Sequence, residues 1–253
     1  MKKILLLLLP LSILFLSSCK DEKVDAFGNV DLNFVATYDG TPIVIGDQFN
    51  YDNGKIFFDK IRVYISNTRI QTDNGSSFVE ADDVEVLDFT QNNTNAEKAG
   101  NGVTVDMTEV PIGGYNKLLF NVGLTNDQNA MIPADFPAGH PLNNTEPYWS
   151  DWESYIFVTI SGRADLDNSG DFEQGFVYHV GGNSTRRAMN LSDRIIVADG
   201  QTTSSKINFD LKKVLYDAAG NPFDIASVSQ VHTQVDIMED FADRIAQAFS
   251  VVE

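Results

Sequence analysis

Three histidines, two tryptophans and one acidic loop are the residues of this chain whose types and spacing could do chemistry. The histidines are His140, His179 and His232, and neutral imidazole is the commonest protein ligand for copper and zinc. None of them lies in an H-E-x-x-H spacing, and the chain has no G-x-S-x-G elbow and no phosphate-binding loop. The histidines therefore either bind a metal or serve as structural residues, and no familiar catalytic motif is present.

The two tryptophans stand three residues apart in an aromatic stretch, together with two tyrosines. This stretch contains Tyr148, Trp149, Trp152 and Tyr155, at a junction between a loop and a strand. Aromatic side chains in such a position either line a binding site or cap a hydrophobic core. His179 lies within a predicted strand in which Phe176, Tyr178 and Val180 share one face, so His179 lies on the other face.

An acidic loop follows the aromatic stretch and has the spacing of hard-cation ligands. Its oxygen-bearing side chains are those of Asp165, Asp167, Ser169, Asp171 and Glu173. Oxygens at positions 1, 3 and 5 and the glycine at position 6 match the start of a calcium loop. Position 12 is Phe176 instead of the usual glutamate, so the loop is either a calcium site or an acidic turn without an ion.

The N-terminal residues have the pattern of a bacterial export signal. Lys2 and Lys3 precede an apolar run, and the sequence from Leu16 to Cys19 resembles a lipobox. The apolar run is shorter than the ~20 residues that span a bilayer, which disfavours a membrane anchor. We therefore expect a signal peptide over residues 1–18, lipidation of Cys19, and a lipidated tether over residues 19–29.

The residues after Cys19 indicate where the protein is located. Lys20, Asp21 and Glu22 resemble the signal that directs lipoproteins to the cell surface in Bacteroidetes-type bacteria. We expect an outer-membrane lipoprotein that is held by its lipid anchor and exposed at the cell surface.

Composition limits the partners. The formal charge is −18, from 36 acidic and 18 basic residues, and such a surface repels phosphate backbones. Nucleic acid is therefore excluded as an expected partner. Cys19 is the only cysteine, so an internal disulfide is impossible and the fold depends on its hydrophobic core.

Short alternating segments separated by turn residues predict the fold. The predicted strands cover residues 31–37, 56–70, 84–89, 103–107, 117–122, 155–161, 176–180 and 206–211. Residues 90–102 and 125–150 are predicted as loops, and residues 241–249 as a helix with one apolar face. This pattern predicts an all-β antiparallel β-sandwich, a single domain over residues 30–253 with a short C-terminal helix.

Four segments also resemble the MbnP-like family of bacterial surface and periplasmic lipoproteins related to copper-binding proteins. They are residues 59–67 (DKIRVYISN), 113–124 (GGY…FNVGL), 140–157 (HPL…YW..W..YIF) and 176–182 (FVYHVGG). A weaker fifth segment covers residues 231–246, and the five segments occur in the family order across nearly the whole mature chain.

The resemblance implies an all-β sandwich that binds a metal through the family's histidine positions, and copper is the metal that the family suggests. His140, His179 and His232 match those positions, and Trp149 matches the first motif tryptophan. In some members of the family a dihaem peroxidase-like partner oxidises a tryptophan to kynurenine, but this sequence has no W-x-H pair of that kind. The sequence departs from the pattern at Pro147 and Ser154 and in the spacing of the tryptophans. Residues 35–37 also lack an early strand histidine, so a copper site is either altered or lost.

Two functions remain as expectations. The first is a non-catalytic lipoprotein that captures and hands over copper through the histidines beside the aromatic residues. The alternative is a ligand- or protein-binding β-sandwich in which the histidines are structural and calcium stabilises the acidic loop. A hydrolase of surface polymers has no supporting triad in the sequence.

Overall fold

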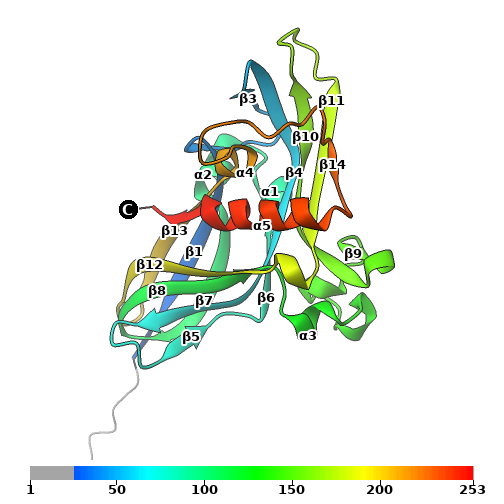
Figure 1. The fold of residues 1–253 in the computed structure, drawn as a ribbon. Coiled ribbons are helices and arrows are strands. Elements are labelled where there is room, and N and C mark those ends of the chain that lie inside the picture. Colours follow the sequence, from blue (N-terminus) through cyan, green and yellow to red (C-terminus); the bar gives the residue numbers. More distant parts are fainter. Residues whose placement is uncertain (1–25, 253) are drawn as a thin grey trace, which may run out of the picture.

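The long strand β4 (Gly54–Thr72) is the scaffold of the molecule in the computed structural model, which describes residues 26–252 (Figure 1). Its apolar side chains at Ile61, Val63 and Ile65 alternate toward the core as the sequence predicts. Five strands pair with β4: β3 (Gln48–Tyr51), β5 (Phe78–Glu80), β6 (Val84–Asp88), β8 (Gly113–Val122) and β10 (Ser154–Asp165). The expected signal peptide, Cys19 and the first part of the expected tether lie outside the described residues.

The larger sheet has ten strands and the order β12-β8-β4-β10-β11-β14 along its main path. Its remaining strands are β9 (Tyr148–Trp149), β11 (Gln174–Gly181), β12 (Arg187–Val197) and β14 (Gln230–Val231). Strand β12 is absent from the sequence prediction. Strand β14 is short and parallel to β11, and it joins the sheet at the edge where the aromatic stretch lies.

The smaller sheet has five strands and contains both ends of the described chain. It consists of β1 (Phe27–Tyr38), β2 (Thr41–Pro42), β7 (Val103–Pro111), β13 (Thr202–Asp210) and β15 (Phe249–Val251). Strands β1 and β13 run parallel, whereas most other pairs are antiparallel. The predicted antiparallel sandwich is therefore confirmed as a sandwich of mixed, mostly antiparallel sheets.

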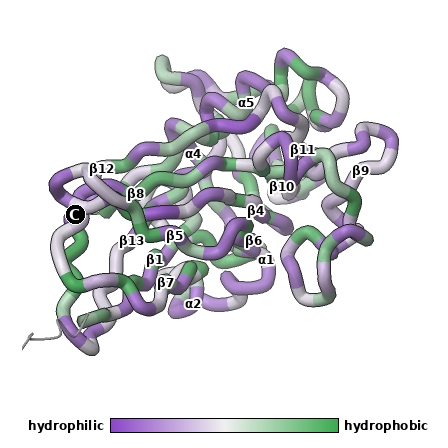
Figure 2. Tube along the Cα trace, turned by 90° about the horizontal axis from the view of Figure 1, so that it is seen from below, coloured by the Kyte–Doolittle hydropathy of each residue, from purple (hydrophilic) through white to green (hydrophobic). Residues whose placement is uncertain are grey.

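The hydrophobic core lies between the two sheets, and Figure 2 colours the chain by the hydropathy of each residue. Aromatic rings bridge the layers: Phe34 of β1 meets Phe120 of β8 edge to face, with ring centroids 5.6 Å apart. Phe249 of β15 stacks on Phe209 of β13 at 4.5 Å. Without an internal disulfide, this burial is the main source of stability.

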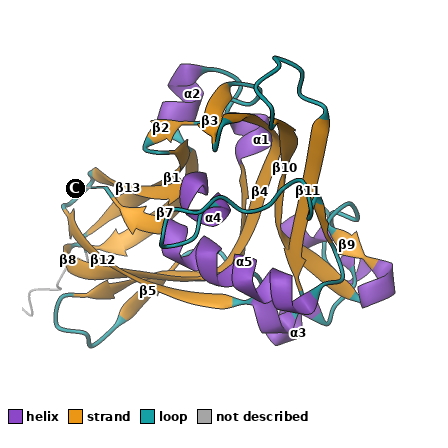
Figure 3. Ribbon diagram, turned by 45° about the horizontal axis from the view of Figure 1, so that its top comes forward, coloured by secondary structure: helices purple, strands orange, loops and turns teal. Residues whose placement is uncertain are grey.

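One long helix and several short ones cover the sheets (Figure 3). The α-helices are α1 (Phe89–Asn92), α2 (Ala96–Asn101), α3 (Asn126–Asn129), α4 (Leu211–Leu215) and α5 (Val235–Ala248). The 3₁₀ turns are η1 (Pro133–Asp135), η2 (Pro141–Asn143), η3 (Ser150–Trp152) and η4 (Asn183–Thr185). No helix of the described chain is long and apolar enough to cross a membrane.

Helix α5 confirms the predicted C-terminal helix and begins six residues earlier than the prediction, at Val235. Its buried face includes Phe241 and Ile245, which the apolar spacing places together. The predicted loop over residues 90–102 instead contains α1 and α2. Asp88 and Asn95 cap these helices by accepting hydrogen bonds from backbone N–H groups of the first turn.

Candidate metal centre

Two of the three histidines meet at the edge of the larger sheet. Strands β11 and β14 pair in parallel, with Val177 opposite Gln230 and Tyr178 opposite Val231. The next position in this register brings His179 beside His232. Their Nδ1 atoms lie 3.1 Å apart, and their rings meet edge to face with centroids 4.8 Å apart. This contact is a hydrogen bond when one Nδ1 carries a proton and the other does not, so the tautomer of each ring decides which one donates.

Packing beneath the sheet edge fixes the position of β14. The Tyr178 hydroxyl donates to the carbonyl of Val228 at 3.0 Å, and the Tyr178 ring packs on Phe241 of α5 at 4.8 Å. Beyond the strand, the side-chain oxygen of Gln234 accepts the backbone N–H of His232 at 3.0 Å. Helix α5 thus anchors the segment that carries His232.

The aromatic stretch forms one wall of this site. Trp149 and Trp152 stack face to face, with centroids 4.6 Å apart and an interplanar angle of 6°. Trp149 lies 5.8 Å from the His179 ring and 5.4 Å from the His232 ring, between centroids. The short pair β9–β10 and the left-handed backbone of Glu153, with φ of 49°, form the turn that brings the indoles together. Tyr148 packs instead against Tyr155, 5.0 Å away.

Asn129, at the end of α3, holds the start of β10 beside the tryptophans. Its side-chain oxygen accepts the backbone N–H of Tyr155 at 2.9 Å and the hydroxyl of Ser154 at 3.1 Å. Its amide donates to Asn183 of η4 at 3.1 Å. One buried amide therefore links α3, β10 and η4, and no local motif in the sequence identifies it.

A row of polar side chains extends from His179 across the sheet. Thr159 of β10 lies opposite His179 on one side and opposite Arg62 of β4 on the other, so the three share one face. Arg62 and Lys60 both form ion pairs with Glu146. Because Ile61, Val63 and Ile65 point to the core, strand alternation could have predicted these cations on the opposite face, but Glu146 lies in a loop without such a signal.

These surroundings keep the His179 ring neutral. Burial, followed by the proximity of His232 and the Lys60 cation, lowers the pKa of His179 to about 4. A neutral imidazole offers a lone pair to a metal near neutral pH, whereas imidazolium does not. The electrostatic environment of His179 is thus compatible with a metal ligand.

His140 occupies a different place. Its Nδ1 accepts the backbone N–H of Leu142 at 3.1 Å, which caps the turn η2. The ring stacks on Phe136 with centroids 4.5 Å apart, and Nε2 lies 3.5 Å from a carboxylate oxygen of Asp83. The structure therefore brings His179 and His232 together and engages both nitrogens of His140 in other contacts.

The acidic loop is organised around one buried carboxylate. Asp165, at the end of β10, accepts the backbone N–H of Ser169 at 3.0 Å and that of Gly170 at 2.9 Å. Asp167 also accepts the N–H of Ser169, at 3.1 Å. The loop is therefore folded by its own hydrogen bonds, and calcium binding by Asp165, Asp167, Ser169, Asp171 and Glu173 stays a prediction.

The histidine pair has the spacing of two ligands of one ion. Nitrogens 3.1 Å apart can both lie at the usual ~2.0–2.1 Å from a metal when the angle at the metal is roughly 100°. This angle is close to the tetrahedral value. It excludes linear coordination of a metal by the two rings in their present positions. Among residues 26–252, no three His, Cys, Asp or Glu side chains are grouped to hold an ion. A metal at this pair would therefore need further ligands from water, from a bound molecule or from another protein.

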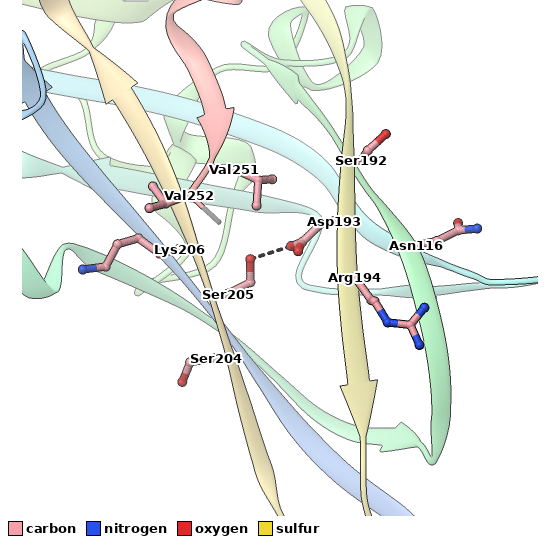
Figure 4. Close-up of a pocket in the computed structure, with 9 residues that line it drawn as sticks. All are labelled: Asn116, Ser192, Asp193, Arg194, Ser204, Ser205, Lys206, Val251 and Val252. Carbon is pink, nitrogen blue, oxygen red and sulfur yellow. Dashed lines mark hydrogen bonds between the residues drawn. The ribbon is translucent and has the colours of Figure 1, made fainter.

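Three cavities of the described chain lie away from the histidine pair. One, of about 670 Å³, opens between β12, β13 and β15 and shares no residue with the histidine pair. Figure 4 shows Asp193 of β12 facing Ser205 of β13 across it, where the Ser205 hydroxyl donates to the carboxylate. This cavity lies where the edges of the two sheets separate.

Comparisons with known proteins agree with this architecture. The MbnP family model matches residues 27–238. The solved structure of MbnP from Methylosinus trichosporium superposes with a TM-score of 0.58 and 18% sequence identity, covering 88% of this chain and 97% of that chain. No curated protein matches the sequence. Since the family match spans most of the chain, this protein belongs to the MbnP family.

Proposed function

We propose that this protein is a non-catalytic surface lipoprotein that binds a metal ion through His179 and His232, and that this ion is copper. The observation that carries the proposal is the 3.1 Å separation of the two Nδ1 atoms. The low pKa of His179 and the tryptophan wall support it, because a neutral ring is ready to bind and aromatic side chains shield a site from water.

Metal binding at this pair replaces a hydrogen bond by two coordinate bonds. Both rings can bind through Nδ1 only when neither carries a proton on that atom, so the proton shared between the two Nδ1 atoms must leave that position. The role of the protein is then capture and transfer of the ion, with open positions for a partner's ligand. A dihaem peroxidase-like partner acting on Trp149 belongs to this proposal.

Calorimetric titration of residues 20–253 with copper tests the proposal. We expect about one ion per chain, and we expect His179→Ala and His232→Ala each to weaken binding roughly tenfold or more, which corresponds to ~1.4 kcal/mol. His140→Ala is the matched control and retains the affinity, because His140 caps a turn elsewhere. Absence of copper binding, or equal binding after His179→Ala, would overturn the proposal.

The second candidate is a β-sandwich binding module with structural histidines and a calcium-stabilised acidic loop. The preformed turn around Asp165 favours it. This function predicts a melting temperature that rises with calcium by mass action and does not respond to copper. An unchanged calcium response after Asp167→Ala would remove the loop from consideration.

A further inference from the structure

Three large apolar side chains are exposed at one end of the sandwich. Phe27, Ile112 and Ile196 are 40%, 49% and 48% exposed, respectively. They come from three distant parts of the sequence: the start of β1, the turn between β7 and β8, and the end of β12. Single exposed apolar residues are common on protein surfaces, whereas a group of them marks an interaction site.

Backbone hydrogen bonds and strand register bring the three residues to the same place. Phe27 pairs with Pro111, and the N–H of Ile112 donates to the carbonyl of Ala26 at 3.1 Å. Ile196 lies opposite Gly114, two residues after Ile112. The N–H of Gly200, in the turn after β12, donates to the carbonyl of Phe27 at 2.8 Å. We call Phe27, Ile112 and Ile196 the apolar end patch.

The patch surrounds the point where the described chain begins. Cys19 precedes Phe27 by eight residues, and an extended chain spans at most ~3.3–3.6 Å per residue. A lipid on Cys19 therefore holds the patch within about 30 Å of the membrane. The short tether also raises the effective concentration of the patch at the bilayer, so a weak apolar contact suffices for docking.

We propose that the apolar end patch docks the protein on a lipid bilayer surface and so sets its orientation. This inference rests on the proposed lipidation of Cys19. Figure 1 shows the patch end, where β1, β8 and β12 meet at the lower left, away from β9 on the right, which carries Trp149. Docking through the patch thus leaves the histidine pair facing away from the membrane and open to a partner.

The charges around the patch select the kind of lipid. Asp73 donates its backbone N–H to Gly114 beside the patch, and Asp199 lies in the turn after β12. Two carboxylates near the contact, in a chain of charge −18, favour a zwitterionic surface over an anionic one. Phosphatidylcholine vesicles are therefore the appropriate probe.

Tryptophan quenching by brominated phosphatidylcholine tests the docking. Residues 19–253 are coupled through the Cys19 thiol to a maleimide lipid in the vesicles, which imposes the tether whether or not the cell acylates Cys19. We compare Ile112→Trp with Val235→Trp, because Val235 at the start of α5 is equally exposed, at 50%, and lies outside the patch. Trp149 and Trp152 give the baseline in the unsubstituted chain.

We expect bromolipid to quench the added fluorescence of Ile112→Trp at least twofold more than that of Val235→Trp. We also expect the quenching of Ile112→Trp to be weaker on anionic vesicles. Ile196→Trp is the second probe and should behave as Ile112→Trp does. Equal quenching at Val235 and Ile112, or no added quenching at Ile112 and Ile196, overturns the docking proposal. Palmitate incorporation in cells tests Cys19 acylation separately, and copper titration tests the metal site, so the three failures are distinguishable.

Discussion

Glu146 is the carboxylate that neutralises two cations beside the histidine pair, and Glu146→Gln should destabilise the fold. Its two oxygens pair with Lys60 and Arg62. The Arg62 side chain is only 8% exposed, whereas that of Glu146 is 51% exposed. Glu146 provides the only ion pair of Arg62 within the described chain, so the substitution leaves a buried guanidinium without its counter-charge.

The size of the effect follows from burial. Removing one partner of a fully buried pair costs ~3–5 kcal/mol, and an exposed pair contributes ~0–1 kcal/mol. Water reaches the carboxylate of Glu146, and glutamine keeps one accepting oxygen for Arg62. We therefore expect the free energy of unfolding to fall by about 2 kcal/mol, measured by urea unfolding of the metal-free protein near pH 7.

The pH dependence gives an independent check. Burial raises the pKa of Glu146, but hydrogen bonds and charge from Lys60 and Arg62 outweigh burial and lower it overall. A carboxyl with a lowered folded pKa contributes stability above its unfolded pKa of ~4.3 and loses that contribution as pH falls through the folded pKa. The difference between the unsubstituted protein and Glu146→Gln should therefore shrink by pH 3.

Glu80→Gln is the matched control. Glu80 is exposed and lies 4.0 Å from Arg69, so its neutralisation should change the free energy of unfolding by less than about 0.5 kcal/mol. The reasoning fails if Glu146→Gln costs no more than Glu80→Gln, or if its cost stays constant down to pH 3.

Substitutions at three further positions test the fold around the site. Burial and then three nearby aspartates raise the pKa of Glu85 to about 7, so its ionisation on raising the pH destabilises the fold. At pH 8, Glu85→Gln should raise the free energy of unfolding by about 1 kcal/mol after discounting for solvent, and with it the melting temperature. The substitution should have no such effect at pH 4. Gly123 has φ of +95°, and a Cβ there would lie 2.4 Å from the buried Phe157 ring, so Gly123→Ala should cost about 3 kcal/mol in urea unfolding. Asn129→Leu leaves the buried N–H of Tyr155 without an acceptor and should cost about 2 kcal/mol, whereas Asn129→Asp keeps the acceptor and should cost less than half of that.

The sequence predicted the strands whose alternation is uninterrupted and failed where the pattern is broken. Strand β4 was predicted from Ile61, Val63 and Ile65 because its apolar side chains alternate without a break. Strand β12 was missed because its pairing with β8 shifts register between Ser192 and Ile195, so polar residues interrupt the alternation. Helices α1 and α2 were missed because each is about one turn long and depends on capping more than on an apolar face.

The candidate site was predictable in its residue types and only partly in its geometry. His179 and the tryptophans were identified, and the structure brings them together with His232. The meeting of His179 and His232 depends on β14, a two-residue strand held by α5, for which the sequence has no periodic signal. His140 was grouped with them by resemblance, yet its ring nitrogens contact a backbone N–H and Asp83, since local capping is not visible in spacing alone.

Electron paramagnetic resonance of one equivalent of Cu(II) bound to residues 20–253 tests the central claim most directly. The nitrogen couplings count the imidazoles on the ion, and the geometry of His179 and His232 predicts two. We expect one imidazole after His232→Ala and two after His140→Ala. A spectrum without imidazole coupling, or one that is the same after His179→Ala, would contradict the assignment of this pair as the metal site.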